Sequence, residues 1–349
     1  MKQSIVLATI LTVLTVMQGF AAERVRVSVL GLFRPQQLVV EVSPHSPLLV
    51  GSGTKEFVAG VDSTQRITLS RSRNAIVANS RSVKITGESV TVAARSGGDS
   101  EITLSIPGKL RRHYRGTLTV LSDGKTLVAV VEMDLETAVA SVVAAEMNAS
   151  APLEALKAQA VVTRSYLVAT RHRHPYSDFC DTTHCQFLRE PPEPKSRAAI
   201  ATRETKGLVL KWNGRVVSAM FFASCGGRTH SLAEVGYQTV DYPYYSVECP
   251  YCHGSPERWS SRISNEDAAK LPPKNESERI KAGRKLGWHA VQSNAYTRTA
   301  RDGAVDLTGV GRGHGVGMCQ RGAIGMARSE KQFRAILAHY FPNTTVGAQ

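Results

Sequence analysis

Aromatic residues are scarce in this sequence of 349 residues, because Phe, Trp and Tyr together make up only 6% of it. That scarcity, together with the lack of any recognised nucleic-acid-binding motif, argues against a nucleic acid as the partner of the basic chain. Acidic residues are also in the minority, 29 against 43 Lys and Arg, which gives a formal net charge of +14. Internal repeats are absent, and 42% of the residues are apolar. These features predict a folded globular chain of one large domain or two ordinary ones.

The longest apolar run lies in residues 1–22 and is shorter than the roughly 20 residues that a membrane span needs. Lys2 precedes this run and Gly19-Phe20-Ala21 ends it, the layout of a secretory signal peptide cleaved after Ala21 or Ala22. A membrane anchor is the alternative, but no Cys follows for lipid attachment. We therefore expect an exported protein of the periplasm, cell wall or extracellular space, without a transmembrane anchor after cleavage.

Removal of the signal takes away one positive charge, that of Lys2, so the mature chain remains strongly basic. A basic exported protein is attracted to anionic polymers, of which a cell wall with carboxylated stem peptides is the nearest candidate. The alternative is that the Lys and Arg side chains merely keep the surface soluble.

Six short alternating segments separated by Gly, Ser, Asp and Pro predict a β-rich region over residues 23–110. They are RVRVSVLG, QQLVVEV, QRITLSR, SVKITG, ESVTVAAR and EITLSI. Asp123-Gly124 predicts a hairpin between Tyr114–Leu121 and Thr126–Met133, and Asn213-Gly214 predicts another between Gly207–Trp212 and Arg215–Phe222. Residues 253–308 are rich in charge and contain Pro-Pro, so we expect a less regular insertion there.

The apolar period becomes helical from Leu135 and predicts a helix that ends near Glu146. A second helix is predicted over 151–170, with Ser150 as N-cap and Pro152 in its first turn. Strand and helix do not alternate regularly, which excludes a doubly wound sheet and favours an α+β class. The expected parts are a signal peptide at 1–22, the β-rich region at 23–110 and a mixed α/β domain at 111–345.

Glu146 is the strongest catalytic candidate because it ends an apolar run at the corner between the two helices. Desolvation of a carboxyl group raises its pKa and lets it keep a proton near neutral pH, as a general acid in glycoside cleavage must. The alternative is a half-exposed glutamate beside a basic neighbour.

Several separated motifs in order give the chain a family resemblance. RRHYRGTLTVLSDGKTLVAVVEMDLETAVASVVAAEM, EALKAQAVVTRSY, CDTTHCQ, FFASCGGRT and GRGHGVGMCQRGAIGMA resemble the SpoIID/LytB family of cell-wall proteins over about residues 112–343. That family includes sporulation stage II protein D lytic transglycosylases, which cut the glycan strands of peptidoglycan, and LytB-type amidase enhancers.

The resemblance implies that Glu146 protonates the glycosidic oxygen and then deprotonates the 6-hydroxyl of the N-acetylmuramyl residue, closing a 1,6-anhydro ring. A lytic transglycosylase can use one carboxyl group, whereas hydrolysing glycosidases usually need two. The matched motifs also supply expected substrate-binding residues: Lys157, Gln159, Arg164, Ser224, Gly226, His314 and Gln320. For the helix residues among them, the alternative is a solvated face with a salt bridge to Glu154. For the glycine-rich loop around His314, it is a tight turn before a helix at Met318–Arg328.

His174, Cys180 and Cys185 place an imidazole and two thiols on one short loop, a set that suits tetrahedral zinc, with His184 as a competing ligand. The set is similar to the His-Cys-Cys zinc site of some SpoIID-type enzymes, although its Cys spacing is one residue shorter. Zinc would be structural or would shape the site. A Cys180–Cys185 disulfide fits the spacing equally well.

The other four cysteines leave further alternatives. Cys249-x-x-Cys252 is half of a zinc knuckle or a disulfide, and the absence of a second Cys pair beside it in the sequence favours the disulfide. Cys225 and Cys319 would form a bridge across the site or remain two buried thiols.

The sequence is compatible with two further functions. The protein could bind peptidoglycan glycan strands or a cell-wall amidase without catalysis, or it could be a zinc hydrolase in which His174, Cys180 and Cys185 hold a catalytic metal.

Overall fold

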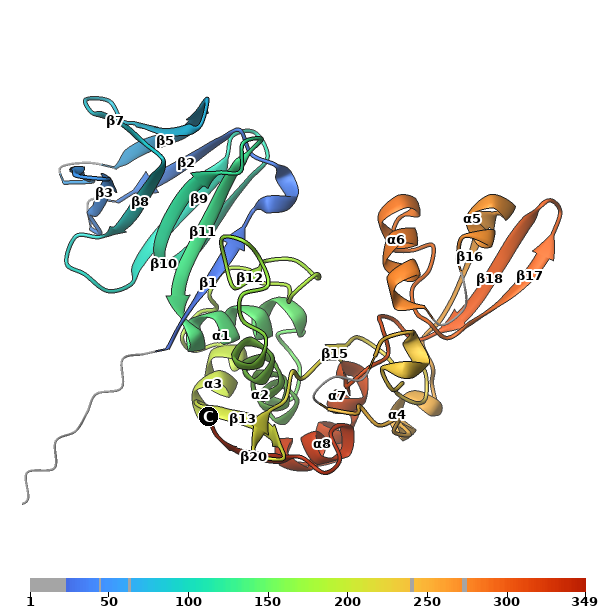
Figure 1. Cartoon of the computed structure of the whole chain (residues 1–349). Helices are drawn as coiled ribbons and strands as arrows, with labels where there is room; N and C mark the ends of the chain where they lie inside the picture. Colours follow the sequence, from blue (N-terminus) through green and yellow to red (C-terminus); the bar gives the residue numbers. More distant parts are fainter. Residues whose placement is uncertain (1–22, 44, 62–63, 239–241, 272–274) are drawn as a thin grey trace, which may run out of the picture.

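The computed structural model describes residues 23–43, 45–61, 64–238, 242–271 and 275–349. The expected signal peptide at 1–22 lies outside these residues. Figure 1 shows a β-rich part at the N-terminus, a helical part in the middle, and a smaller sheet with helices beside it at the far end. The fold class is α+β, as predicted. Within the described ranges, no helix combines the length and apolar character required to cross a membrane.

Most strands of the N-terminal part belong to one large sheet with the path β12-β1-β11-β10-β9-β2-β5-β6-β7, from which β3, β4 and β8 branch. All six strand segments predicted in 23–110 are present, and β3, β4 and β6 are additional. The bounds are β1 Arg24–Val29, β2 Gln37–Val42, β3 Leu48–Ser52, β4 Lys55–Ala59, β5 Gln65–Ser72, β6 Ala75–Asn79, β7 Lys84–Gly87, β8 Ser89–Ala94, β9 Ser100–Ile106, β10 Leu110–Ser122 and β11 Leu127–Asp134.

Strand β10 connects the N-terminal strands to the helical part. Its first half pairs with β9 up to Gly116, and its second half, from Thr117, pairs with β11 and β8. Gly116 has a φ of 148°, and a Cβ there would lie 2.2 Å from the carbonyl oxygen of Glu132, so the strand turns where only glycine fits. Leu110 and Arg111, between which the domain boundary is expected, are both residues of β10 and pair with β9.

Both predicted turns are confirmed, but the second strand of the Asn213-Gly214 hairpin is only Arg215–Val216, because Phe221–Phe222 pairs with another strand. Asn213 and Gly214 have φ values of 49° and 78° between β13 (Leu208–Trp212) and β14 (Arg215–Val216), as a tight primed turn requires. In the β10–β11 hairpin, Gly124 has a positive φ of 87° and Asp123 does not. The Asp123 carboxylate instead accepts hydrogen bonds from the backbone N–H groups of Lys125 and Thr126, which fixes the turn.

The two predicted helices are α1 (Leu135–Glu146) and α2 (Leu153–Ala169). Asp134 caps α1 by accepting from the N–H groups of Glu136 and Thr137. The prediction that Ser150 caps α2 is wrong, because Pro152 is the N-cap and no side chain caps that end. The expectation that Glu146 lies at the corner between the helices is confirmed.

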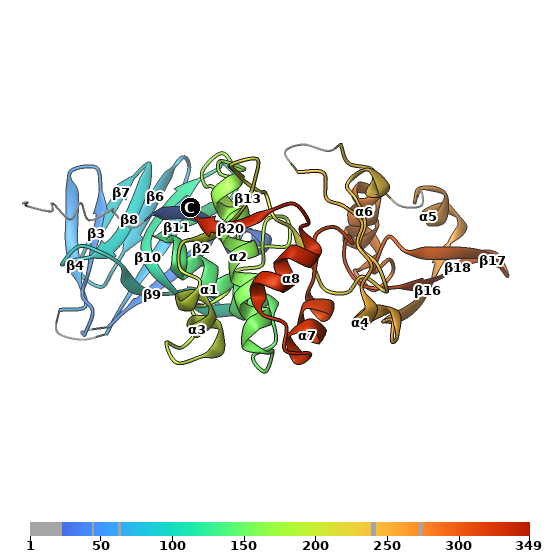
Figure 2. The same ribbon diagram turned by 90° about the horizontal axis from the view of Figure 1, so that it is seen from below.

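Helix α2 is the central element of the molecule. Leu156 and Ala160 pack into the core beneath the large sheet, whereas Ala158 and Val161 pack into a second core formed with the C-terminal part. In Figure 2, α7 (Gln320–Arg328) and α8 (Phe333–Tyr340) lie beside α2, and both contact it. The helix is therefore buried on nearly all sides, not along a single stripe.

Residues 253–308 are more regular than predicted. They contain a three-stranded sheet of order β16-β18-β17 and two helices, with a core of their own that includes Trp259, Val291 and Leu307. The bounds are β16 Arg258–Ser264, α5 Asn265–Ala269, α6 Glu276–Leu286, β17 Tyr296–Arg301 and β18 Ala304–Val310. The expectation of an irregular insertion is wrong, because alternating apolar residues of β16 and β18 bury one face of this sheet.

The chain then returns to the helical part. Strand β19 (Met318–Cys319) pairs in parallel with β15 (Phe221–Phe222), and β20 (Thr345–Ala348) pairs with β13. The remaining elements are η1 Gly31–Phe33, β12 Phe179–Cys180, α3 Arg197–Glu204, η2 Ala233–Val235 and α4 Pro250–His253. The predicted helix Met318–Arg328 begins at Gln320, since its first two residues form β19.

Candidate functional site

Glu146 is the last residue of α1, and its side chain is half-buried at the inter-helix corner. Val142, Val143 and Met147 around it are 1%, 0% and 6% exposed. The backbone N–H of Phe187 donates a hydrogen bond of 3.0 Å to Glu146 Oε1. An apolar end of a helix and one backbone donor thus hold the carboxyl group in place.

Burial raises the pKa of Glu146 to about 6 from an ordinary 4.5, and the hydrogen bond from Phe187 opposes this rise. No charged side chain in the described part of the chain contributes to the shift of this pKa. A carboxyl group with such a pKa can donate a proton near neutral pH and take one back.

The loop of the predicted metal ligands is anchored to the large sheet. Phe179 and Cys180 form β12, which pairs in parallel with Val27 and Ser28 of β1. The carboxylate of Asp181 accepts a hydrogen bond of 3.0 Å from the backbone N–H of Leu30. The ligand loop therefore has a fixed position over β1.

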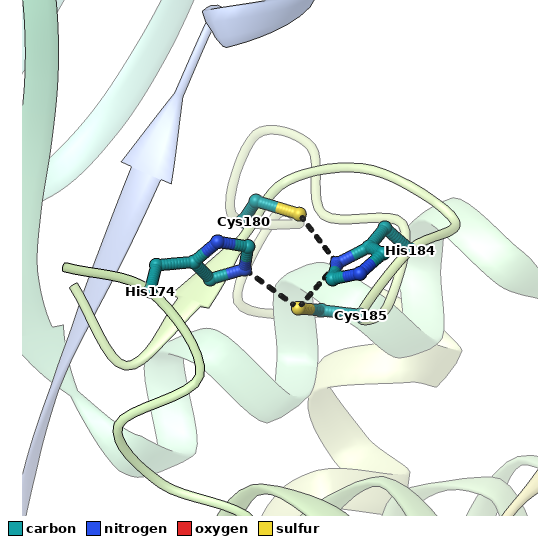
Figure 3. A group of neighbouring side chains, drawn as sticks. All are labelled: His174, Cys180, His184 and Cys185. Carbon is teal, nitrogen blue, oxygen red and sulfur yellow. Dashed lines mark hydrogen bonds between the residues drawn. The ribbon is translucent and has the colours of Figure 1, made fainter.

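His174, Cys180, His184 and Cys185 come together in this loop (Figure 3), with one ligand atom of each lying within 4.8 Å of all the others. His174 Nε2 lies 3.2 Å from Cys185 Sγ, and His184 Nδ1 lies 3.6 Å from the same sulfur. Tetrahedral zinc with ordinary bond lengths separates sulfur and nitrogen ligands by about 3.6 Å. The donor set and its spacing therefore fit zinc, and His184 is positioned as a fourth ligand and not merely as a competitor of His174.

The ligand loop is joined to the candidate acid. Cys185 is followed by the buried Gln186 and then by Phe187, whose N–H contacts Glu146. Anything that fixes Cys185 consequently also restrains Phe187, two residues farther on. Through the N–H of Phe187 it restrains the carboxyl group of Glu146.

Gln159 and Gln320 form a buried pair next to Glu146. Gln159 is 0% exposed and Gln320 is 8% exposed. The amide of Gln320 donates to the carbonyl oxygen of Glu146 at 3.3 Å and to Gln159 Oε1 at 3.2 Å. Both residues thus belong to the site, but they hold its backbone, so the expected direct contact of Gln159 with a sugar does not fit its burial.

Arg164 is expected to bind a substrate carboxylate, but in the structure its guanidinium contacts groups of the protein itself. Its side chain is 0% exposed and forms a forked ion pair with Glu136, with distances of 2.8 and 2.6 Å. It also donates to the carbonyl oxygen of Leu208 at 3.0 Å. Arg164 is buried because α2 is covered on both sides, and it ties α1 to β13.

Lys157 forms ion pairs with Glu154 at 2.7 Å and Glu204 at 2.8 Å. The salt bridge to Glu154 is the one that the alternative interpretation of this helix face predicted. The carboxylates of Glu154 and Glu204 therefore neutralise the charge of the Lys157 ammonium group.

His314 is held by the backbone on both sides of its ring. Nε2 lies 2.9 Å from the carbonyl oxygen of Phe221, and Nδ1 accepts from the N–H of Val316 at 3.1 Å, which makes Nε2 the protonated nitrogen. Burial lowers the pKa of His314, which favours this neutral form. The ring joins the glycine-rich loop to β15, so a direct role in sugar binding does not fit its contacts.

Ser224 and Gly226 lie where the two glycine-rich motifs meet. Ser224 is 2% exposed, and its backbone bridges to Arg312. Gly226 has a φ of 71°, and a Cβ there would lie 2.7 Å from Val310. Glycine at 226 thus permits close packing of protein on protein, and its role in substrate binding stays a prediction.

The predicted Cys249–Cys252 disulfide is wrong, since all six cysteines are free in the structure. The same finding excludes a Cys180–Cys185 and a Cys225–Cys319 bridge here. The sequence argument failed because the missing second pair, Cys225 and Cys319, is brought beside Cys249 and Cys252 by the fold.

Comparisons with known proteins agree with these motifs. The family model "SpoIID: Stage II sporulation protein" matches residues 123–212. An uncharacterized protein of Brachyspira hyodysenteriae is 30% identical over 261 residues, which cover 65% of this chain and 70% of the relative. Stage II sporulation protein D of Bacillus subtilis is 27% identical over 261 residues, 62% of this chain and 76% of that protein. The amidase enhancer of Bacillus subtilis is 38% identical over 97 residues, 28% of this chain and 13% of that protein. The chain belongs to the SpoIID/LytB family.

Proposed function

We propose that this protein is an exported cell-wall remodelling enzyme, a lytic transglycosylase that cuts peptidoglycan glycan strands with Glu146. The observation that carries the proposal is the isolated, half-buried carboxyl group whose pKa is raised to about 6. Family membership and the similarity to stage II sporulation protein D support the cell-wall role.

In the proposed reaction, the protonated Glu146 gives its proton to the oxygen that links C1 of N-acetylmuramic acid to the next sugar. The C1–O bond breaks, the next sugar leaves with a free 4-hydroxyl, and the acetamido group assists at C1. The 6-hydroxyl oxygen of the same N-acetylmuramyl residue then bonds to C1 and passes its proton to the Glu146 carboxylate. The products are a 1,6-anhydro end and a regenerated acid, and no water is consumed.

A pKa near 6 suits both halves of this cycle, because the group must be an acid first and a base afterwards. Hydrolysing glycosidases usually divide these tasks between two carboxyl groups. The shift of the Glu146 pKa arises from burial and a backbone donor alone, which supports a mechanism with one carboxyl group.

We further propose that zinc bound by His174, Cys180, His184 and Cys185 shapes the site. Four protein ligands leave no open position, as in structural zinc sites. Bound zinc would make the loop rigid. The rigid loop would hold the N–H of Phe187 in place, and this hydrogen bond would fix the carboxyl group of Glu146. The closed ligand set disfavours the zinc-hydrolase alternative.

A non-catalytic role as an amidase enhancer is the second candidate, and it rests on the similarity to the Bacillus subtilis amidase enhancer. Digestion of purified glycan strands, with and without stem peptides, followed by mass analysis of the ends separates the candidates. Anhydro ends support the proposed enzyme, reducing ends would mean hydrolysis, and intact strands would leave the binding role.

A further inference from the structure

A second group of potential metal ligands lies apart from the His174 loop. Cys225 follows β15, Cys249 is the N-cap of α4, Cys252 lies within α4, and Cys319 ends β19 and caps α7. Their exposed fractions are 6%, 1%, 0% and 0%. All four sulfur atoms lie within 4.8 Å of one another, although the residues come from three separate segments of the chain.

The distances between these sulfur atoms distinguish the possible arrangements. A disulfide requires about 2.05 Å between two sulfurs, but Cys252 Sγ and Cys319 Sγ are 3.6 Å apart. Four thiolates at about 2.3 Å from a tetrahedral metal are about 3.8 Å from one another. The spacing is that of a tetrathiolate site and not that of two bridges.

Neighbouring donors are directed at the sulfurs. The backbone N–H groups of Cys225 and Gly322 each donate to Cys319 Sγ at 3.3 Å. The hydroxyl of Tyr340, which is 1% exposed, lies 3.3 Å from Cys249 Sγ. Such outer hydrogen bonds orient thiolate ligands and offset the net negative charge that four of them leave around a divalent ion.

The surrounding backbone leaves room for the sulfurs only because of a glycine. A Cβ at Gly322 would lie 2.5 Å from Cys249 Sγ and 2.0 Å from the Tyr340 hydroxyl oxygen. The first turn of α7 is therefore shaped around the cluster.

We propose that Cys225, Cys249, Cys252 and Cys319 bind a structural Zn²⁺ ion, a site separate from the His174 loop. Binding releases the protons of the four thiols to solvent and involves no oxidation. The ion joins the loop after β15, helix α4 and the start of α7. Because Gln320 directly follows Cys319 and contacts Glu146, the ion also fixes one side of the candidate active site.

Zinc content per chain tests this proposal without reference to activity, so its outcome is independent of the proposed reaction. The full mature protein is compared with the Cys249→Ser/Cys252→Ser variant and with the matched control Cys180→Ser/Cys185→Ser. We expect the Cys249→Ser/Cys252→Ser variant to contain one zinc ion fewer per chain than the wild type. This loss should not depend on the zinc content of the control variant, because the two groups of ligands are separate. Unchanged zinc content in the first variant would overturn the proposal.

A measurement on the unmutated protein covers the case in which that variant does not fold. Alkylation and peptide mapping of the zinc-loaded protein should find these four cysteines protected, and all four should become labelled once a chelator is added, without a reductant. Labelling before chelation, or labelling that requires reduction of Cys249–Cys252 or Cys225–Cys319 disulfides, would contradict the site. Either result would leave the proposed function of Glu146 standing.

Discussion

Phe187 donates its backbone N–H to the carboxylate of Glu146 at 3.0 Å, across 41 residues of sequence. This contact connects the candidate acid at the end of α1 to the loop of Cys and His residues that is anchored on β1. The position of the candidate acid is thus coupled to the ligand loop, and through that loop to the large sheet.

The pH dependence of strand cleavage should follow the protonation of Glu146. Because the first step needs the protonated acid and burial raises its pKa to about 6, kcat/KM should fall about tenfold per pH unit above that value. Initial rates of anhydro-end formation between pH 4 and 9 would show this limb. A rate that stays constant up to pH 8 would be inconsistent with Glu146 as the acid.

Glu146→Gln should stabilise the protein at high pH. The pKa of Glu146 is raised in the folded state, so its contribution to stability is fully present below the ordinary value of 4.5 and is lost as the pH rises through about 6. This rise in the pKa of Glu146 corresponds to about 2 kcal/mol of unfolding free energy, which the wild type loses when Glu146 ionises. The uncharged Gln side chain has no such loss. Denaturant unfolding at pH 4 and pH 8 should therefore show a gap between variant and wild type that opens only at pH 8.

The matched control for this comparison is Glu101→Gln, which changes an exposed glutamate on β9. It should show no such pH-dependent gap. An equal response of the two variants would mean that the burial of Glu146 has no energetic consequence.

Arg164→Ala should destabilise the fold by about 3 kcal/mol, because it leaves the carboxylate of Glu136 without its partner at the junction of α1 and α2. Arg164→Lys should restore little of this loss, since one ammonium cannot reproduce the forked contact. Denaturant unfolding measures the effect. A folded Arg164→Ala protein of unchanged stability and raised KM would instead support the substrate-binding role that the sequence predicted.

Cys185→Ser should lower activity by about tenfold or more, because a loosened ligand loop no longer holds Phe187 against Glu146. Zinc analysis and cleavage rates on the same preparation test both parts. A variant that loses zinc but cleaves as fast as the wild type would show that the loop does not shape the site.

Local pattern was sufficient to predict much of this fold. Alternation of apolar residues predicted β1, β2 and β5, because one face of each strand packs into the core. Asn213-Gly214 predicted its hairpin because both residues tolerate positive φ. The position of Glu146 followed from the end of one helical period and the Pro-containing start of the next.

Such local patterns could not predict contacts between residues that are far apart in the sequence. Arg164 falls on the same helical stripe as Leu156 and Ala160, but its charge favoured an exposed position. The contacts of its guanidinium with Glu136 on α1, Thr202 on α3 and Leu208 on β13 explain its complete burial. Cys225 and Cys319 are separated by 94 residues, so nothing near Cys249 indicated that they complete its cluster. The Cys-x-x-Cys spacing was the available signal, and it was interpreted as a disulfide.

The most direct test of the account measures 1,6-anhydro ends released from purified glycan strands by the wild type, by Glu146→Gln and by the control Glu101→Gln. We expect anhydro ends from the wild type and the control, and at least about 100-fold fewer from Glu146→Gln, the lower range for loss of a general acid. Equal release by Glu146→Gln, or strands left intact by the wild type, would contradict the proposed role of Glu146.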